Sequence, residues 1–352
     1  MRKKLTVLEQ VLVEDYAAEG KAISRHEGKV IFIEGAVPGD VVDVRIIKSK
    51  ADWAEGKVAH FHKYSDQRVE PFCEHFGVCG GCKWQMLPYS KQLEYKQNEV
   101  AQHLKRIGKV ELPEIRQIMG AFPDRRYRNK LEFTFSNRRY LLPSEIANRE
   151  KIPAENAVGF HVAGIFDKVI DISTCHLMEE PANAIRNLLR SYAAKKGYSY
   201  YDIKYHHGFL RNLMVRICRT GEIMINLCVG EQDNAASRDV INYLVGQVPE
   251  ITSAFVTVNG KFNDSIYDLT PKLYYGQPFV IEKLGEFRFK VGPKSFFQTN
   301  TFQGERLYQV TSDFAELTGK ETVYDLYCGT GSIGIFLSGK AAKIVGVETI
   351  AE

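Results

Sequence analysis

The sequence lacks any apolar run close to the roughly 20 residues that a membrane-spanning helix needs. Its first ten residues, Met1–Gln10, have no apolar core of the kind found in secretory signal peptides. Low-complexity segments are also missing, and the 44% of apolar and 26% of charged residues are ordinary for a globular protein. We therefore expect a folded, cytoplasmic protein without a membrane partner.

A strong net charge is absent too, since the formal value is only +4. The charge is nevertheless uneven along the chain. Residues 1–70 carry twelve basic and twelve acidic residues, whereas residues 83–140 carry thirteen basic and six acidic ones. A basic middle segment suggests a polyanionic partner, most simply nucleic acid. A solvated basic face explains the excess equally well.

Three patterns follow one another along the chain. Residues 5–62 contain short β-rich runs separated by turns such as Pro38-Gly39, which predict a small β-barrel. Residues 127–290 mix strands and helices, as in an α+β domain with a mostly antiparallel sheet. From residue 321 a strand, a glycine-rich turn, a helix and a strand predict one βαβ unit. We place the domain boundaries at 1–64, 65–295 and 296–352.

The expected elements have these ranges. Helices are predicted over 89–107, 181–194, 235–245, 302–317 and 332–337. Strands are predicted over 30–33, 41–47, 56–61, 127–135, 213–219, 222–229, 255–259, 321–327 and 343–348, with a hairpin across Thr220-Gly221.

The glycine-rich turn is a candidate nucleotide site. Asp325 lies near the end of the strand before the turn, and the turn itself contains Gly329, Gly331 and Ser332. Glu348 lies at the end of the next strand, about twenty residues further along the chain. Such a turn lets a ligand reach the backbone and the helix N-terminus, and the acid can hold ribose hydroxyls. A glycine turn without a ligand is the alternative. The run from Asp325 to Gly331 resembles motif I of class I methyltransferases, which implies S-adenosyl-L-methionine and not NAD.

Three of the seven cysteines are close together, as Cys73-x5-Cys79-x2-Cys82. Disulfides are rare in the cytosol, so a metal site is the better first interpretation. A tetrahedral site needs a fourth ligand, for which Cys175 is the best candidate. On spacing alone an iron–sulfur cluster, zinc and unligated thiols all stay open.

Two further segments are candidates for contacts with RNA. Arg125, Arg126, Arg128 and Lys130 interleave basic and aromatic residues, a composition that suits an RNA backbone, although a strand edge protected by charge is the alternative. In Ser295–Asn300, Phe296 and Phe297 could stack on a base, or Thr299 or Asn300 could simply cap a helix.

Together these motifs resemble the RNA (uracil-5-)-methyltransferases, and among them the bacterial 23S rRNA enzymes of the RumA/RlmD and RlmCD type. The resemblance spans the whole chain. It implies a multidomain fold: an OB-like TRAM barrel that binds RNA, a central α+β domain with an iron–sulfur cluster, and the start of a Rossmann-like class I methyltransferase domain.

The resemblance also implies roles for residues. Cys73, Cys79, Cys82 and Cys175 correspond to the ligands of a [4Fe–4S] cluster. Gln298, Tyr327 and Glu348 correspond to contacts with S-adenosyl-L-methionine, with Ser332 a weaker candidate, and the segment Ser295–Asn300 becomes part of the cofactor and substrate site.

The catalytic residues of that family are not matched. Its enzymes attack uracil C6 with a cysteine thiolate, and a base later removes the C5 proton. The nucleophile follows an Asp-Pro-Pro-Arg motif that this sequence lacks, and Cys328 belongs to the glycine turn. We therefore expect a C-terminally truncated chain that has no catalytic residue of its own and does not methylate alone.

The leading hypothesis is thus the recognition part of a monomeric 23S rRNA uracil-C5 methyltransferase, involved in rRNA processing. A non-catalytic iron–sulfur RNA-binding module with a vestigial nucleotide turn is the alternative. A radical S-adenosylmethionine enzyme fits less well, because those use a Cys-x3-Cys-x2-Cys spacing. The tRNA branch of the family typically lacks the barrel and the cluster.

Overall fold

The computed structural model describes residues 6–147 and 156–350. The chain forms two compact units, Met1–Gly120 and Ala121–Glu352. The expected boundaries at 64/65 and 295/296 stay predictions. Within the described residues no helix is both long enough and apolar enough to cross a membrane.

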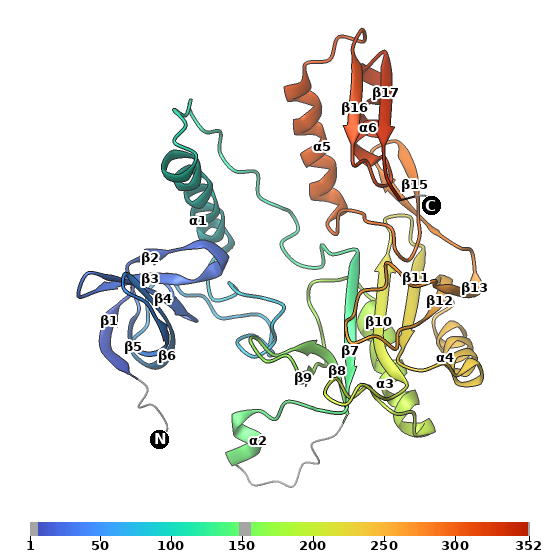
Figure 1. Ribbon diagram of the computed structural model, residues 1–352, viewed down its shortest axis with the longest axis horizontal. Coiled ribbons are helices and arrows are strands. Elements are labelled where there is room, and N and C mark those ends of the chain that lie inside the picture. Colours follow the sequence, from blue (N-terminus) through green and yellow to red (C-terminus); the bar gives the residue numbers. More distant parts are fainter. Residues whose placement is uncertain (1–5, 148–155, 351–352) are drawn as a thin grey trace. The chain divides into compact units, whose positions relative to one another are not determined.

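The first unit begins with a six-stranded sheet that curls into a small barrel (Figure 1). Its strands, in the spatial order β1-β5-β6-β4-β3-β2, are β1 (Val7–Leu12), β2 (Asp15–Tyr16), β3 (Ala22–His26), β4 (Lys29–Glu34), β5 (Val41–Ser49) and β6 (Trp53–Lys63), with a short 3₁₀ turn at Ala18–Gly20. The Ser24 hydroxyl donates to the Leu12 carbonyl at 2.7 Å, which brings β1 back to β3. Ile31 and Ile33 of β4 and Val42 and Val44 of β5, each pair two residues apart, are buried in a common core. The predicted barrel is confirmed.

A buried carboxylate fixes the turn between β4 and β5. Asp40 is fully buried, and its carboxylate accepts bonds from the amides of Val37 and Ser65 at 2.7 and 2.8 Å. The Arg68 guanidinium adds two bonds to the same carboxylate, at 2.9 and 2.6 Å. Gly39, at φ +93°, provides the left-handed conformation that this turn requires. Asp40 therefore ties the barrel to the segment that leaves it.

The predicted helix 89–107 is α1 (Tyr89–Gln102), followed by a π-helical turn, His103–Ile107, which Gly108 ends. The cysteine-bearing loop before it has no strand or helix, but it is packed. Leu87 is buried against Val37, with Trp84 and Tyr16 beside them. The Gln92 side-chain amide of α1 donates to the carbonyls of Trp84 and Leu87 at 3.0 and 2.9 Å.

The second unit is built on a seven-stranded sheet in the order β13-β12-β11-β10-β7-β8-β9. The strands are β7 (Lys130–Ser136), β8 (Ala157–His161), β9 (Val169–Asp171), β10 (Leu210–Ile217), β11 (Ile223–Val229), β12 (Ile251–Val258) and β13 (Lys272–Gly276). All neighbours are antiparallel except β11 and β12, which run parallel. The predicted mostly antiparallel sheet is confirmed, as is the hairpin, where Gly221 takes φ +86°.

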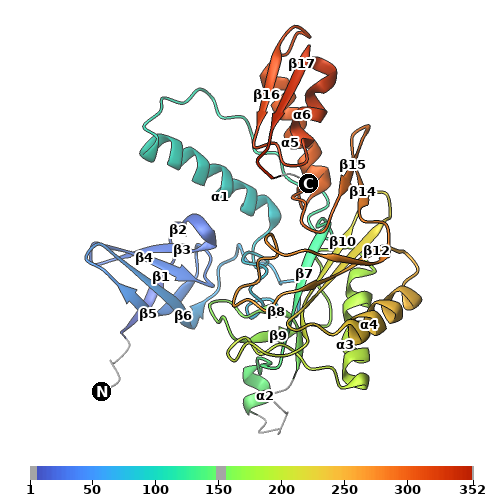
Figure 2. The ribbon, with the colours of Figure 1, turned by 45° about the vertical axis from the view of Figure 1, so that its right-hand side comes forward.

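The two faces of this sheet differ in chemistry. Leu131, Phe133 and Phe135 of β7 point to a buried apolar face. The helices α3 (Ala182–Lys196) and α4 (Asn234–Gln247) cover that face, as Figures 1 and 2 show. The alternate residues, Lys130 and Glu132, lie on the opposite face, as the alternation predicted. The short helix α2 (Pro143–Ala147) follows β7 along the chain.

The remaining elements follow the sheet. The hairpin of β14 (Val280–Leu284) and β15 (Phe287–Val291) leads to α5 (Thr301–Ala315). Then come β16 (Thr322–Leu326), α6 (Ser332–Leu337), a 3₁₀ turn at Ser338–Lys340 and β17 (Lys343–Val347). β16 and β17 pair in parallel, so the predicted βαβ unit is confirmed. The hairpin β14–β15 was not predicted.

We expect Asp40→Asn to lower the free energy of unfolding of the first unit by about 3 kcal/mol, because it leaves the Arg68 guanidinium next to an uncharged partner. Chemical denaturation followed by circular dichroism measures this. The matched control is Asp66→Asn at an exposed position nearby, which should change stability by less than about 0.5 kcal/mol. Equal effects of the two variants would contradict the anchoring role of Asp40.

Candidate functional site

The glycine-rich turn between β16 and α6 has the backbone geometry expected of a ligand-binding turn. Tyr327, Gly329 and Gly331 have φ values of +59°, +53° and +70°, and Gly331 is the N-cap of α6. The left-handed conformation is unusual for a tyrosine and leaves its side chain 88% exposed. The turn thus presents backbone and an aromatic ring to solvent at the start of a helix.

Asp325 and Glu348 fix the two sides of this turn. The carboxylate of Asp325 accepts a bond from the Gly334 amide at 2.8 Å and so joins β16 to α6. The carboxylate of Glu348 accepts from the Gly329 amide at 2.8 Å, and its other oxygen accepts from the amides of Thr349 and Ile350. Bonds from the Ile350, Gly329 and Thr349 amides lower the pKa of the Glu348 carboxyl. Glu348 is therefore an exposed, oriented carboxylate beside the turn.

Ser332, in the first turn of α6, has its partner on another helix. Its hydroxyl shares a hydrogen bond of 2.8 Å with the phenol of Tyr308 on α5. Tyr308 is buried in the core that joins α5 to the hairpin β14–β15. This contact fixes α6, and with it the turn, to α5 within the second unit.

The segment Ser295–Asn300 is held at its end by a buried polar cluster. The Asn129 amide group donates to the Gln298 carbonyl at 2.9 Å and to the Thr301 hydroxyl at 2.8 Å. The Thr301 hydroxyl donates to the fully buried carboxylate of Glu282 at 3.0 Å. The Asn129 backbone amide donates to the Thr299 carbonyl at 2.7 Å. Strand β7 therefore begins at the point where this segment ends.

Of the two interpretations of this segment, helix capping is observed and stacking on a base stays a prediction. Asn300 caps α5, because its side chain accepts from the Gln303 amide at 3.0 Å, so the simple capping role is confirmed. Phe296 is 68% exposed, whereas Phe297 is buried and packs on Phe289 with ring centroids 5.7 Å apart. Phe296 thus exposes its ring to solvent, while Phe297 anchors the segment in the core. The half-buried side chain of Gln298 packs against Gly304 of α5. A Cβ atom built on Gly304 would lie 3.0 Å from the Cβ atom of Gln298.

The basic candidates differ in exposure. Arg125 and Arg126 are exposed, and Arg126 forms an ion pair of 3.6 Å with Glu179. Arg128 is half-buried and donates to the Lys130 carbonyl. β7 lies between β10 and β8, but β8 pairs only with Thr134–Ser136, so the alternative of a strand edge protected by charge stays a prediction for residues 125–130. Burial lowers the pKa of Lys130, which lines a pocket on the open face of the sheet.

The four candidate cysteines are distributed over the two units. Cys73, Cys79 and Cys82 are half-buried in the loop before α1, and the Gly81 amide donates to the Cys79 sulfur at 3.4 Å. Cys175 is buried in the second unit, where the Asn183 side chain bonds to its backbone amide and carbonyl. Among residues 6–147 and 156–350, no group of three or more His, Cys, Asp or Glu residues is arranged to hold a metal ion. The predicted cluster is therefore not shown by the structure.

The other cysteines differ from an activated nucleophile. Burial raises the pKa of the Cys218 thiol, and it raises the pKa of Cys228 to about 12. The sulfur of Cys328 faces Gly346, where a Cβ would come within 3.1 Å of it. As predicted, Cys328 belongs to the glycine turn.

Sequence reasoning missed Asn129, Glu282 and three residues that line the pocket on the sheet: Glu132, Asn212 and Asn226. The polar residues inside the apolar strands Leu210–Ile217 and Ile223–Val229 could have indicated them, since buried amides need partners.

Known proteins resemble this chain along its length. Residues 8–59 match the model of the TRAM domain. A protein of Bacteroides thetaiotaomicron described as an uncharacterized RNA methyltransferase is 48% identical over 96% of this chain and 75% of its own length. One from Porphyromonas gingivalis with the same description is 41% identical over 97% of this chain and 74% of its own length.

A solved structure is similar in fold. The Pyrococcus abyssi tRNA (uracil-54, C5)-methyltransferase in complex with S-adenosyl-L-homocysteine superposes with a TM-score of 0.68 at 24% identity, over 93% of this chain and 70% of that one. Together with the relatives, this establishes a TRAM domain joined to a methyltransferase-like fold. The chain belongs to the RNA methyltransferase family.

The close packing around Gly334 leads to a stability prediction. A Cβ there would lie 2.9 Å from both the Asp325 carboxylate and Ile344, so Gly334→Ala should destabilise the second unit by about 2 kcal/mol. Gly339 has open space around its Cβ position, and Gly339→Ala is the control that should leave stability within about 0.5 kcal/mol. Thermal unfolding of both variants measures the difference. A neutral Gly334→Ala would show that the turn is not tightly packed.

Proposed function

We propose that this protein acts in S-adenosyl-L-methionine-dependent methylation of uracil C5 in RNA, with 23S rRNA as the substrate. One observation carries the proposal: beside the glycine turn after β16, the Glu348 carboxylate accepts a hydrogen bond of 2.8 Å from the Gly329 amide. The chain that contains this site belongs to the RNA methyltransferase family. The Pyrococcus abyssi relative supports uracil C5 as the target by its fold and name. The barrel and the basic residues before β7 support an RNA substrate.

The residues present fit the cofactor. When bound, S-adenosyl-L-methionine supplies the methyl group. Glu348 is charged and exposed, so its carboxylate can accept bonds from the ribose hydroxyls. The exposed ring of Tyr327 can cover the adenine, and the side-chain amide of Gln298 can bind the amino-acid end. The amides at the N-terminus of α6 add positive potential beside the turn.

The nucleophile of the proposed reaction is not assigned to any cysteine of this sequence. Burial raises the pKa of the Cys218 and Cys228 thiols, which disfavours their thiolates, and the half-buried Cys328 has its sulfur next to Gly346. We therefore expect the 352-residue chain to bind RNA and cofactor without transferring the methyl group. A non-catalytic RNA-binding module, the second candidate, predicts RNA binding without cofactor binding.

Calorimetric titration with S-adenosyl-L-homocysteine separates these candidates. We expect wild-type chain to bind and Glu348→Gln to bind about tenfold more weakly, because the neutral amide is a poorer acceptor for hydroxyl groups. Glu250→Gln, at an exposed position before β12, is the charge-matched control and should bind like wild type. Identical affinities of Glu348→Gln and wild type would remove Glu348 from the site.

Tritiated methyl transfer tests the reaction and its substrate. Deproteinised 23S rRNA and bulk tRNA, both from a methylation-deficient strain, are offered to the chain with labelled cofactor. We expect no steady incorporation by the 352-residue chain. Turnover on 23S rRNA at uracil C5 would overturn the predicted inactivity while supporting the substrate, and turnover on tRNA alone would overturn the rRNA assignment.

A [4Fe–4S] cluster on Cys73, Cys79, Cys82 and Cys175 stays a prediction from the sequence. The cysteine spacing and the amide that points to the Cys79 sulfur support it, since amide bonds to cluster thiolates are common. We expect anaerobically purified protein to be brown and to contain about four irons and four sulfides, and Cys79→Ser to lose most of both. If the purified protein contained one zinc ion per chain and no sulfide, the site would be a zinc site and not a cluster. Cys328→Ser is the control that should keep the metal content unchanged.

Two further expectations belong to this proposal. A cytoplasmic location agrees with an RNA substrate and with cysteines kept reduced. A monomer is the expected state in solution, which light scattering would check.

A further inference from the structure

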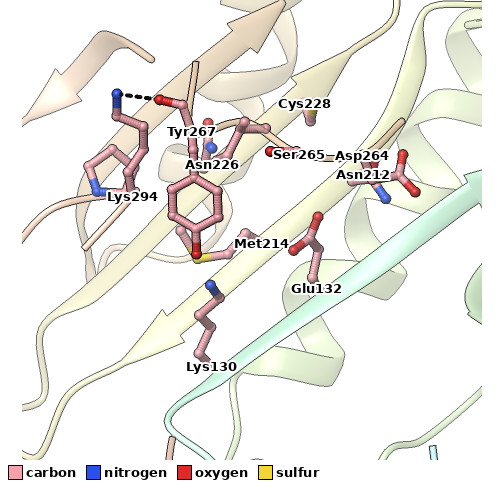
Figure 3. Close-up of a pocket in the computed structure, with 12 residues that line it drawn as sticks. Lys130, Glu132, Asn212, Met214, Asn226, Cys228, Asp264, Ser265, Tyr267 and Lys294 are labelled. Atoms are coloured by element: carbon pink, nitrogen blue, oxygen red, sulfur yellow. Dashed lines mark hydrogen bonds between the residues drawn. The ribbon is translucent and has the colours of Figure 1, made fainter. Parts of the chain in front are cut away.

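The open face of the central sheet carries a polar pocket that the proposed cofactor site does not use. It has a volume of about 100 Å³. Its floor is formed by Lys130 and Glu132 of β7, Asn212 and Met214 of β10, and Asn226 and Cys228 of β11, and its mouth by residues 264–267 and 293–294. Figure 3 shows Lys130 and Glu132 rising from β7, with Tyr267 and Lys294 on the loops across from them.

The floor contains a buried amide without a complete set of partners. Asn212 is 4% exposed, and its side-chain oxygen has no hydrogen-bond donor among the described residues. The only hydrogen bond found for its NH₂ group there is a long one of 3.4 Å to the Thr134 hydroxyl. An unsatisfied buried polar atom costs about 1–3 kcal/mol, so such an atom in a pocket indicates a ligand or water. Asn226 beside it is 2% exposed and accepts from Thr257.

The mouth of the pocket is rigidly built. Arg211, whose side chain is only 3% exposed, donates to the carbonyls of Asn259, Lys261 and Asn263 and to the Asp264 carboxylate. Lys294 donates to the carbonyls of Tyr267 and Leu269, both at 3.2 Å. The loop 259–269 is thus tied from both of its ends. A loop that is already held in place loses little conformational freedom when a ligand binds, which favours specific binding in this pocket.

The mixed charges lining the pocket disfavour a simple ion as its ligand. Two cations, Lys130 and Lys294, face two carboxylates, Glu132 and Asp264, and Asp264 is already paired with Arg211. Glu132 is open to the pocket mouth, but the surrounding protein partly desolvates it and raises the pKa of its carboxyl. The carboxylates would repel a phosphate, and the lysines would repel a metal ion. A neutral, flat molecule with hydrogen-bonding edges is compatible with both.

The rim around the loop carries exposed aromatic and basic side chains. Phe262 is 79% exposed and lies against the His206 ring at 4.3 Å between centroids. Tyr205 is 64% exposed, with the Lys204 ammonium 5.4 Å from its ring centre. Aromatic rings and cations side by side are typical of surfaces that bind single-stranded RNA.

We propose that this pocket binds one nucleobase of the substrate RNA, a base with an exocyclic amino group, in the single-stranded stretch next to the methylated uracil. The Glu132 carboxylate and the Asn212 side-chain oxygen accept bonds from the amino group, which uracil lacks. The pocket adjoins the candidate active segment, because Pro293 and Lys294 line it directly before Ser295. The inference rests on the proposed RNA substrate and adds a specificity site to it.

Fluorescence anisotropy with single-stranded RNAs of about 12 nucleotides tests the pocket. Each RNA is oligouridine with one central variable base. Guanine is compared with hypoxanthine, and adenine with unsubstituted purine, because each pair differs only in the amino group. We expect wild-type chain to bind the amino-bearing member of at least one pair about fivefold or more tightly, the ratio expected from one buried hydrogen bond.

Two variants and a control assign the effect to the pocket. Asn212→Ala and the isosteric Glu132→Gln should reduce the ratio to about one while general, salt-dependent binding persists. Asn242→Ala, on the exposed side of α4 and so behind the opposite face of the sheet, should keep the wild-type ratio. Circular dichroism verifies that each variant is folded.

The outcomes separate this inference from the proposed function. RNA binding by wild type without amino-group discrimination overturns the pocket but leaves the RNA substrate intact. Discrimination that survives both pocket variants also overturns it. If wild type binds none of the RNAs at low salt, the proposed RNA substrate and the pocket are overturned together.

Discussion

The second unit depends on one fully buried carboxylate, that of Glu282. Its oxygens accept bonds from the Arg219 amide, the Thr301 hydroxyl and the Asn129 side chain, so three segments distant in sequence meet at one charge. A buried carboxylate is stable only when its lone pairs are satisfied. The start of β7, the hairpin β10–β11 and the start of α5 must therefore hold their relative positions for the charge to be tolerated. The candidate cofactor segment is held in the same way, because it ends at Asn300, directly before Thr301.

The two faces of the central sheet differ in how they are covered and in which side chains they carry. One face is apolar and covered by α3 and α4, and it supplies the core. The other face is apolar where Met214, Met224 and Phe255 pack against the hairpin β14–β15, and polar beyond that point. Polar side chains in a strand interior reduce the buried apolar area and lower stability. Asn212 and Asn226 therefore lower the stability of the sheet, which is consistent with a role of these two side chains in binding.

Much of the fold could be predicted from local sequence. The alternation over residues 130–135, the turn at Thr220-Gly221 and the helices α3 and α4 all have short-range causes, and their boundaries deviate by only a few residues from those expected. The glycine turn and Glu348 were found because their spacing is set by one βαβ unit. In contrast, the roles of Asn129 and Glu282 depend on contacts across more than 150 residues, for which no periodicity exists. The pocket on the sheet was missed for the same reason, since its lining comes from three strands and two loops.

Strand β7 has a consequence for how far apart the sites lie. Asn129, directly before β7, donates a hydrogen bond to the Gln298 carbonyl. Glu132, three residues further along, lines the pocket on the sheet. An extended strand rises about 3.4 Å per residue, so the two points are separated by about 10 Å of straight backbone. That length does not change with the side chains, and only an insertion or deletion in β7 would alter it. The backbone of β7 therefore sets the spacing between the end of the candidate cofactor segment and the pocket on the sheet.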